Sequence, residues 1–352
     1  MKKLFVTALI AALAYSGATA ADGNKRKRVD ESKMGAYLMV YHKDADHGLH
    51  MAVSYDGYKW SALNNDKAVI AGDTIAEQHG IRDPHIFRGP DGGFYLAMTD
   101  LHVFGKRDGI RDTEWERDGK KYGWGNNRGL VLMKSFDLIN WTRTNLDFTY
   151  LGGKWNDVGC VWAPEVCYDD KAKKIMVHFT VRFGAGKESI YYIYTNDDFS
   201  RMDTKPVEMF SAPDHKYSVI DSDIIKYKGK YHLFYVSHEH TATPVHATAK
   251  KITGPYAIDT LYQDGEKRGH EAPNCWKRIG EEKYIVMFDN YRTNPHNFGF
   301  VETADFKTYK PIGYFDQKGS PMTRTNFSAQ KHGAVIWLTK DEALALEQHW
   351  NK

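Results

Sequence analysis

Strand patterns separated by polar turns fill this chain from about residue 36 to residue 339, and this feature limits its fold more than any other. The first clear helical pattern of apolar residues comes late, at 340–347. Before it, one unit recurs: an aromatic-rich strand after a glycine or a charged turn, then a second strand that ends in a polar turn. Strands without covering helices must pack on other strands, so an all-β protein is predicted.

The repeating units predict how the strands are arranged. Complete units contain the aromatic strands 93–98, 174–179, 230–235 and 283–288, whereas half units remain at the two ends, at 36–60 and 332–338. Pairing the half units closes a ring of five blades, which leaves only short protected edges. We therefore predict a five-bladed β-propeller followed by a short C-terminal helix, with blades at about 36–63 plus 331–339, 84–143, 160–202, 219–257 and 271–311. A β-sandwich would instead show shorter strand spacing and no matched end pieces.

The N-terminus has the features of a secretory signal. Lys2 and Lys3 precede an apolar run from Leu4 to Tyr15, and small residues end the segment at Ala20. We expect 1–20 to be a cleaved signal peptide, 21–35 a disordered linker and 36–352 a single propeller domain, exported to the periplasm or secreted. No later stretch approaches membrane-spanning length, so no membrane span is expected.

Charge and cysteine content narrow the partners. The formal net charge is +3, and Lys2 and Lys3 carry two of these charges, so we expect no nucleic-acid partner. Cys160, Cys167 and Cys275 cannot all pair within one chain. A disulfide between the first two would suit an oxidising compartment, but buried free thiols are favoured. The sequence does not reveal the oligomeric state.

Carboxylates stand at the starts of strands in three of the units, as Asp83, Asp221 and Glu271. Their similar placement predicts that they converge on one point. Carboxylates held close together shift each other's pKa values, so one can remain a proton donor while another accepts a proton. This predicts acid/base hydrolysis. Asp223 lies two residues after Asp221 and would face the same side of a regular strand, so the pattern alone leaves the choice between the two open.

Six motifs in this order, one or two to a unit, resemble those of glycoside hydrolase family 43: 82–86, 161–166, 220–224, 270–273, 289–291 and 331–333. By this resemblance Asp83 is the general base, Glu271 is the general acid, and Asp221 orients the acid and tunes its pKa. Asp223 and Glu165 are then structural. An inverting hydrolase needs a base to activate water on one face of the sugar and an acid of raised pKa on the other.

The resemblance also implies contacts with the sugar and an ion. We expect substrate to contact Trp162, His85, Arg292 and Trp124. Trp124 lies in a polar insertion, 103–128, that is too long for an ordinary blade hairpin and either overhangs the cleft or forms a disordered loop. His332 matches the family's innermost C-terminal histidine, which implies a structural Ca²⁺ or Na⁺ in the central channel. No cofactor is required for the chemistry. Lys331 stands where the family usually has Arg.

These features predict an exported, inverting glycoside hydrolase that releases terminal sugars from plant-type polysaccharide or its oligosaccharides. An exo-α-L-arabinofuranosidase is the nearest activity, while β-xylosidase, galactofuranosidase and arabinanase activities occur on the same scaffold. A related five-bladed fructosidase would carry an Asn-Asp-Pro nucleophile motif and a Glu-Cys acid motif, neither of which is in the sequence. A noncatalytic carbohydrate-binding propeller should lack one of the three acids.

Overall fold

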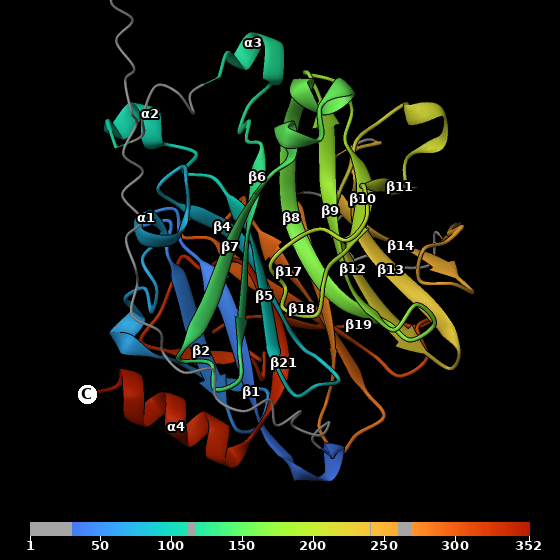
Figure 1. Ribbon diagram of the computed structural model, residues 1–352. Helices are drawn as coiled ribbons and strands as arrows, with labels where there is room; N and C mark the ends of the chain where they lie inside the picture. Colours follow the sequence, from blue (N-terminus) through green and yellow to red (C-terminus); the bar gives the residue numbers. More distant parts are fainter. Residues whose placement is uncertain (1–29, 111–116, 240, 260–268) are drawn as a thin grey trace, which may run out of the picture.

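The computed structural model describes residues 30–110, 117–239, 241–259 and 269–352 (Figure 1). The predicted signal peptide and residues 21–29 of the predicted linker lie outside the described residues. Residues Glu31–Lys33 form a short 3-10 helix, η1, and the first strand begins at Met34, two residues before the predicted domain boundary.

The described strands form five sheets, here called blades 1 to 5. Blade 1 contains β1 (Met34–His42), β2 (Leu49–Ser54), β3 (Lys59–Ala62), β20 (Thr323–Thr325) and β21 (Lys331–Thr339). Blade 2 contains β4 (Ile81–Arg88), β5 (Phe94–Asp100), β6 (Gly129–Ser135) and β7 (Trp141–Asp147). Blade 3 contains β8 (Val158–Asp169), β9 (Lys174–Phe183), β10 (Ser189–Tyr194) and β11 (Val207–Phe210).

Blade 4 contains β12 (Val219–Tyr227), β13 (Lys230–Ser237), β14 (Thr243–Ala249) and β15 (Ala257–Asp259), and blade 5 contains β16 (His270–Lys277), β17 (Tyr284–Asn290), β18 (Asn297–Thr303) and β19 (Lys310–Tyr314). Short helices lie between strands: η2 (Asn64–Asp66), α1 (Gly72–Ile75), α2 (Gly105–Asp108), α3 (Gly119–Tyr122), η4 (Phe148–Leu151), η5 (Gly153–Asp157) and η6 (Pro213–His215).

The predicted ring closure is confirmed. β1 pairs antiparallel with β21, from Met34 opposite Thr339 to His42 opposite Lys331. The innermost strands β21, β4, β8, β12 and β16 contact one another in a closed ring around the central channel. The predicted blades end too early at their outer edges: β11 lies wholly beyond residue 202, and β7, β15 and β19 run past residues 143, 257 and 311.

Apolar side chains pack between neighbouring blades. Five buried clusters each join two adjacent blades, in the cyclic order 1–2, 2–3, 3–4, 4–5 and 5–1. Each blade therefore buries both faces, which explains why aromatic residues recur in the central strands. The three cysteines are buried and unpaired, so the prediction of free thiols is confirmed.

The C-terminal helix α4 (Lys340–Trp350) covers blade 1 on the side opposite α2 and α3 (red in Figure 1). Thr339 begins it with a capping box: its hydroxyl accepts a hydrogen bond from the Glu342 amide, and the Glu342 carboxylate accepts one from the Thr339 amide. Ala343 and Leu346 pack into the cluster between blades 1 and 2. None of the helices in the described ranges combines the length and apolar character that a membrane crossing requires.

A β-bulge interrupts the innermost strand of every blade. At each bulge two residues of the inner strand oppose one residue of its neighbour. The first of the two has a left-handed backbone with φ between 39° and 55°, and these residues are Asp83, Ala163, Asp221, Ala272 and His332. Such a conformation costs about 1–3 kcal/mol in a non-glycine residue. Bulges redirect side chains, so the regular alternation of faces breaks at these five positions.

Hydrogen bonds between blades stabilise the bulges. The amide of each left-handed residue donates to a side chain of the preceding blade, at 2.9–3.3 Å; the acceptors are His42, Thr99, Thr180, Asp221 and Asp289. Because a bulge removes these amides from the strand ladder, an external acceptor is needed. The five bonds fix the direction in which the bulge residues face the channel.

Candidate active site

A pocket of about 270 Å³ opens at one end of the central channel. Its volume lies near the lower end of the roughly 300–1,000 Å³ of typical ligand pockets, which suits one sugar unit. Asp83, Asp221 and Glu271 all line it, so the predicted convergence of the three acids is seen in the structure. The other lining residues are Arg82, Leu101, Trp124, Trp162, Ile220, Tyr291, His296, Lys331 and His332.

Asp83 is held in the ionised form. Burial alone would raise its pKa, but the positive charge of His332, whose Nδ1 lies 3.3 Å from Asp83 Oδ1, lowers that pKa well below its usual range. The Thr99 hydroxyl also donates a hydrogen bond to Asp83 Oδ2 at 2.8 Å. At neutral pH this carboxylate can therefore accept a proton.

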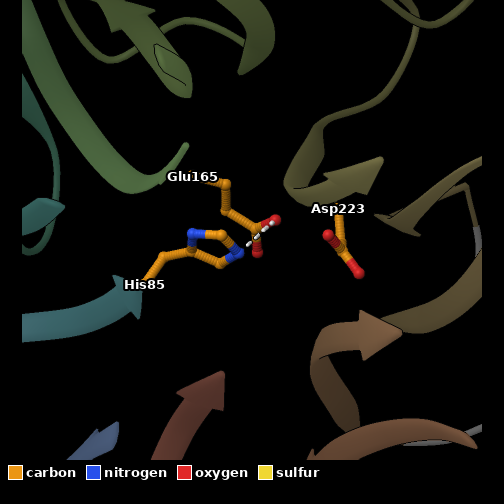
Figure 2. A group of neighbouring side chains, drawn as sticks. All are labelled: His85, Glu165 and Asp223. Carbon is orange, nitrogen blue, oxygen red and sulfur yellow. Dashed lines mark ion pairs between the residues drawn. The ribbon is translucent and has the colours of Figure 1, made fainter. Parts of the chain in front are cut away.

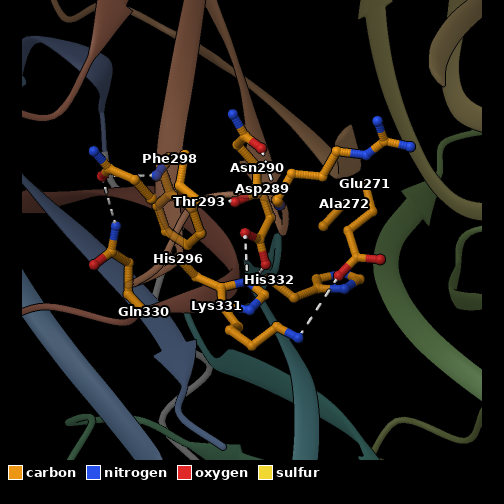
Figure 3. A network of polar contacts seen from close by, with 12 residues as sticks. Glu271, Ala272, Asp289, Asn290, Thr293, His296, Phe298, Gln330, Lys331 and His332 are labelled. Atoms are coloured by element: carbon orange, nitrogen blue, oxygen red, sulfur yellow. Dashed lines mark hydrogen bonds and ion pairs between the residues drawn. The ribbon is translucent and has the colours of Figure 1, made fainter. Parts of the chain in front are cut away.

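Glu271 is held in the protonated form. Burial and the negative charge of Asp289 raise its pKa to about 8, although Lys331, whose Nζ lies 3.9 Å from Glu271 Oε1, opposes the shift (Figure 3). Burial also raises the pKa of Asp221 to about 6, against the positive charge of His332. Asp221 Oδ2 accepts a hydrogen bond from the amide of Ala272, so this carboxylate fixes the backbone beside Glu271.

His332 faces three acids. Burial alone would lower its pKa, but Asp83, Asp221 and Glu271 raise the pKa of the imidazole to about 9. An imidazolium carries a proton on both nitrogens and has no lone pair for a cation. Among the described residues, His332 belongs to no group of three His, Cys, Asp or Glu donors whose ligand atoms all lie within 4.8 Å of one another. In this protonation state His332 would not ligate the expected Ca²⁺ or Na⁺ directly; the ion stays a prediction, and we derive no step through it.

A second polar layer lies two residues further along the inner strands and borders a separate pocket at the other end of the channel. In it, Glu165 lies beside His85 and Asp223, with ligand-type atoms all within 4.8 Å of one another (Figure 2). His85 Nδ1 accepts a hydrogen bond from the Val166 amide at 3.1 Å, so Nε2 carries the proton of the neutral ring and points it toward Glu165, 3.6 Å away. This tautomer presents no lone pair to a metal.

The second layer joins the blades. Asp223 accepts a hydrogen bond from the Cys275 amide, and Asn274 accepts one from the Val335 amide, as His85 does from Val166. We expected His85 to contact the sugar, but it lies two residues beyond Asp83 along β4 and lines the other pocket. Asp223 lines that pocket as well, in agreement with the structural role expected for it.

Of the three other predicted substrate contacts, two line the pocket and one does not. Trp162 and Trp124 line the pocket with their ring centroids 6.1 Å apart and their planes at 71°. Arg292 does not line the pocket: it is exposed and lies over Gly269. Sequence reasoning missed Arg82 and Tyr291 as lining residues, although both stand inside recognised motifs. It also missed Leu101 and His296, which lie outside those motifs.

The second layer predicts a pH effect on stability. Burial raises the pKa of Glu165 well above its ordinary value and that of Asp223 to about 6. Both groups lose their protons near pH 4 in the unfolded chain, so the folded state binds more protons above that pH. Their stabilisation is complete below about pH 4 and is lost as the pH rises through the folded pKa values.

Glu165→Gln should therefore flatten the decline in unfolding free energy between pH 5 and pH 8, because the amide stays neutral. The expected change is on the order of 1 kcal/mol per pH unit, measured by urea unfolding. Glu77→Gln, at an exposed glutamate, is the control and should leave the decline as it is. If the unfolding free energy of Glu165→Gln fell with pH as steeply as that of the wild type, Glu165 would not be the group that holds a proton in the folded state.

Comparisons with known proteins show the family and the fold. Residues 32–343 match a family model described as "Probable glycosyl hydrolase domain". The chain is similar to an α-L-arabinofuranosidase of Bifidobacterium longum subsp. longum, with 29% identity over 199 residues. That match covers 51% of this chain and only 17% of the relative's length.

Two solved structures share the fold. An endo-1,4-β-xylanase from Bacteroides thetaiotaomicron superimposes with a TM-score of 0.56 at 12% identity, covering 79% of this chain and 91% of that one. A mutant of the GH43 protein BlXynB from Bacillus licheniformis superimposes with a TM-score of 0.54 at 14% identity, covering 81% of this chain and 53% of that one. At these identities the likeness concerns the fold alone.

Proposed function

The chain belongs to the glycosyl hydrolases related to family 43, and on this premise we propose that it is an inverting exo-α-L-arabinofuranosidase that releases terminal sugars from plant-type polysaccharide. The observation that carries the proposal is a pair of carboxyl groups with opposite pKa shifts in one pocket. Asp83 is held ionised and Glu271 is held protonated. When their environments shift the pKa values of two carboxyl groups in opposite directions, the group with the lowered pKa is assigned as the base and the group with the raised pKa as the acid.

The proposed reaction is a single displacement. Asp83 takes a proton from water while the water oxygen bonds to the anomeric carbon, and the glycosidic bond breaks. Glu271 gives its proton to the departing oxygen, so the products leave Asp83 protonated and Glu271 ionised, and solvent restores both. The negative charge of Asp221 near Glu271 raises the pKa of Glu271, so the acid keeps its proton until the glycosidic bond breaks.

The proposed sugar is supported by the pocket and by the name of one relative. A pocket of about 270 Å³ supports removal of one sugar at a time, and Trp162 offers an aromatic wall beside it. The arabinofuranosyl group is proposed because the Bifidobacterium relative carries that name. Export is part of the proposal and is supported by the N-terminal sequence alone.

A panel of nitrophenyl glycosides tests the activity. We expect the α-L-arabinofuranoside to give the highest kcat/KM, above the β-xyloside and the galactofuranoside. Proton NMR of the first product should show inverted anomeric configuration, and added methanol should give no methyl glycoside. Retention or methyl transfer would require a covalent intermediate and would contradict the role of Asp83 as base. Failure to cleave any glycoside would favour a noncatalytic propeller.

A further inference from the structure

We propose that Trp124 forms a rim subsite for the polysaccharide backbone that carries the cleaved sugar, and that Arg182 positions the segment presenting it. The inference rests on the proposed function and specifies its substrate: an arabinofuranosyl side chain on a backbone of pyranose rings. The Gly123–Asn127 stretch of the insertion is called the Trp124 segment below.

Trp124 lies at the rim of the pocket. It lines the pocket, yet 69% of it is exposed to solvent. Large exposed aromatic side chains beside a pocket mark binding surfaces more often than they mark cores. Its neighbour Trp162 is partly buried and contacts it edge to face, so the two rings form a continuous aromatic wall from the pocket to its rim.

Arg182 of β9 anchors the Trp124 segment to blade 3. Its Nη2 donates hydrogen bonds to the backbone carbonyls of Tyr122, at 2.8 Å, and Trp124, at 2.9 Å. Its Nη1 pairs with Glu188 at 2.6 Å, and its guanidinium lies 4.8 Å from the centre of the Trp162 ring. One buried planar group thus fixes the position of both tryptophans, which a lysine could not do.

Glycine and asparagine residues complete the anchorage. Gly123 has φ +81°, and a Cβ there would lie 2.8 Å from the Arg182 guanidinium carbon. The Trp162 indole donates to the Gly125 carbonyl at 2.9 Å. The Asn127 side chain donates to three backbone carbonyls and accepts from the Val161 amide at 2.7 Å. Of the alternatives for the insertion, the described part beside Trp124 therefore overhangs the pocket; 111–116 lie outside the described residues.

The position of Trp124 indicates which part of the substrate it meets. The three acids surround a pocket with room for one sugar unit, so the cleaved sugar fills it. A ring stacked on Trp124 would stay half in solvent, as a backbone residue of a long polymer does. A pyranose chair offers a flat C–H face to an indole, whereas a puckered furanose ring offers less contact. Since the indole is already held in place, stacking on it costs little entropy.

Kinetics on two polymers test the proposal. Trp124→Ala should raise KM for arabinoxylan, which has a pyranose backbone, about tenfold with little change in kcat. The change for branched arabinan, which has a furanose backbone, should be smaller. Trp124→Phe is the matched control: it keeps a flat ring and should retain most of the affinity. Inhibition by free L-arabinose, which fills only the pocket, should change far less than KM for arabinoxylan in both variants, because Trp124 forms only the rim of the pocket.

Arg182→Lys should reproduce the rise in KM for arabinoxylan. Combined with Trp124→Ala, it should add little to the effect of either change alone, because both act on one subsite. An unchanged KM for arabinoxylan in Trp124→Ala would overturn the proposal, and so would an equal rise in KM and in the L-arabinose inhibition constant. Failure of the wild-type protein to release arabinose from any polymer would instead overturn the proposed function.

Discussion

Replacing Asp83 by Asn should lower kcat by about 10²- to 10⁴-fold on every glycoside, whatever its leaving group. An amide cannot take a proton from water, and the attacking water needs this base in each turnover. The size and shape of the side chain are conserved, and the amide can still accept the hydrogen bond from Thr99. The measurement compares kcat for nitrophenyl and unactivated substrates of the same sugar.

Asp223→Asn is the matched control for Asp83→Asn. It makes the same chemical change in a buried carboxylate of the channel, but Asp223 borders the other pocket and bonds to the Cys275 amide. Its activity should stay within a few-fold of the wild type at neutral pH. Substantial turnover by Asp83→Asn, or an equal loss in Asp223→Asn, would show that the base has been assigned to the wrong residue.

The ring could be predicted because its evidence is local and repeated. Each blade contributes one aromatic central strand, and the two half units at the ends of the domain are complementary. Pairing 36–60 with 332–338 needed only the rule that a sheet avoids open edges, and β1 pairs with β21 as expected. The three acids could be located for a similar reason, since each stands in a short motif at the start of an inner strand.

The depth of each residue in the channel could not be predicted. Strand alternation predicts that Asp221 and Asp223 share a face, and both carboxylates do accept hydrogen bonds from amides of β16, at Ala272 and Cys275. Two residues further along the strand nevertheless place Asp223 at the other pocket, and His85 lies beyond Asp83 in the same way. No glycine marks the bulge positions; instead, the amide of the strained residue donates a hydrogen bond to a side chain of the preceding blade, which stabilises it.

Long-range contacts decide the rest of the site. Arg182 lies far along the sequence from Trp124 and on a different blade, so no local pattern links the two residues. His332 shows the same dependence: three acids on three other blades raise the pKa of its imidazole, and its Nδ1 pairs with Asp83. Sequence motifs identify such residues but do not give their protonation states.

Replacing Glu271 by Gln should lower activity more on substrates with poor leaving groups than on substrates with activated ones. Substrates with poor leaving groups need a proton from the acid and should lose about 10²- to 10⁴-fold in kcat, whereas aryl glycosides with activated leaving groups should lose much less. Binding should be retained, because Gln fills the same space. Equal losses on both classes of substrate would show that Glu271 does not donate the proton.

The pH profile gives an independent measure of the same residue. Glu271 must be protonated to act as the acid, and its pKa is raised to about 8 by burial and by Asp289. Activity of the wild type on poor leaving groups should therefore be full below this pH and fall as the pH rises through about 8. In Glu271→Gln the alkaline fall should disappear from the residual activity, since no proton remains to be lost. A fall that persists would assign it to another group in the pocket, such as His332, whose pKa is raised to about 9 by the three acids around it.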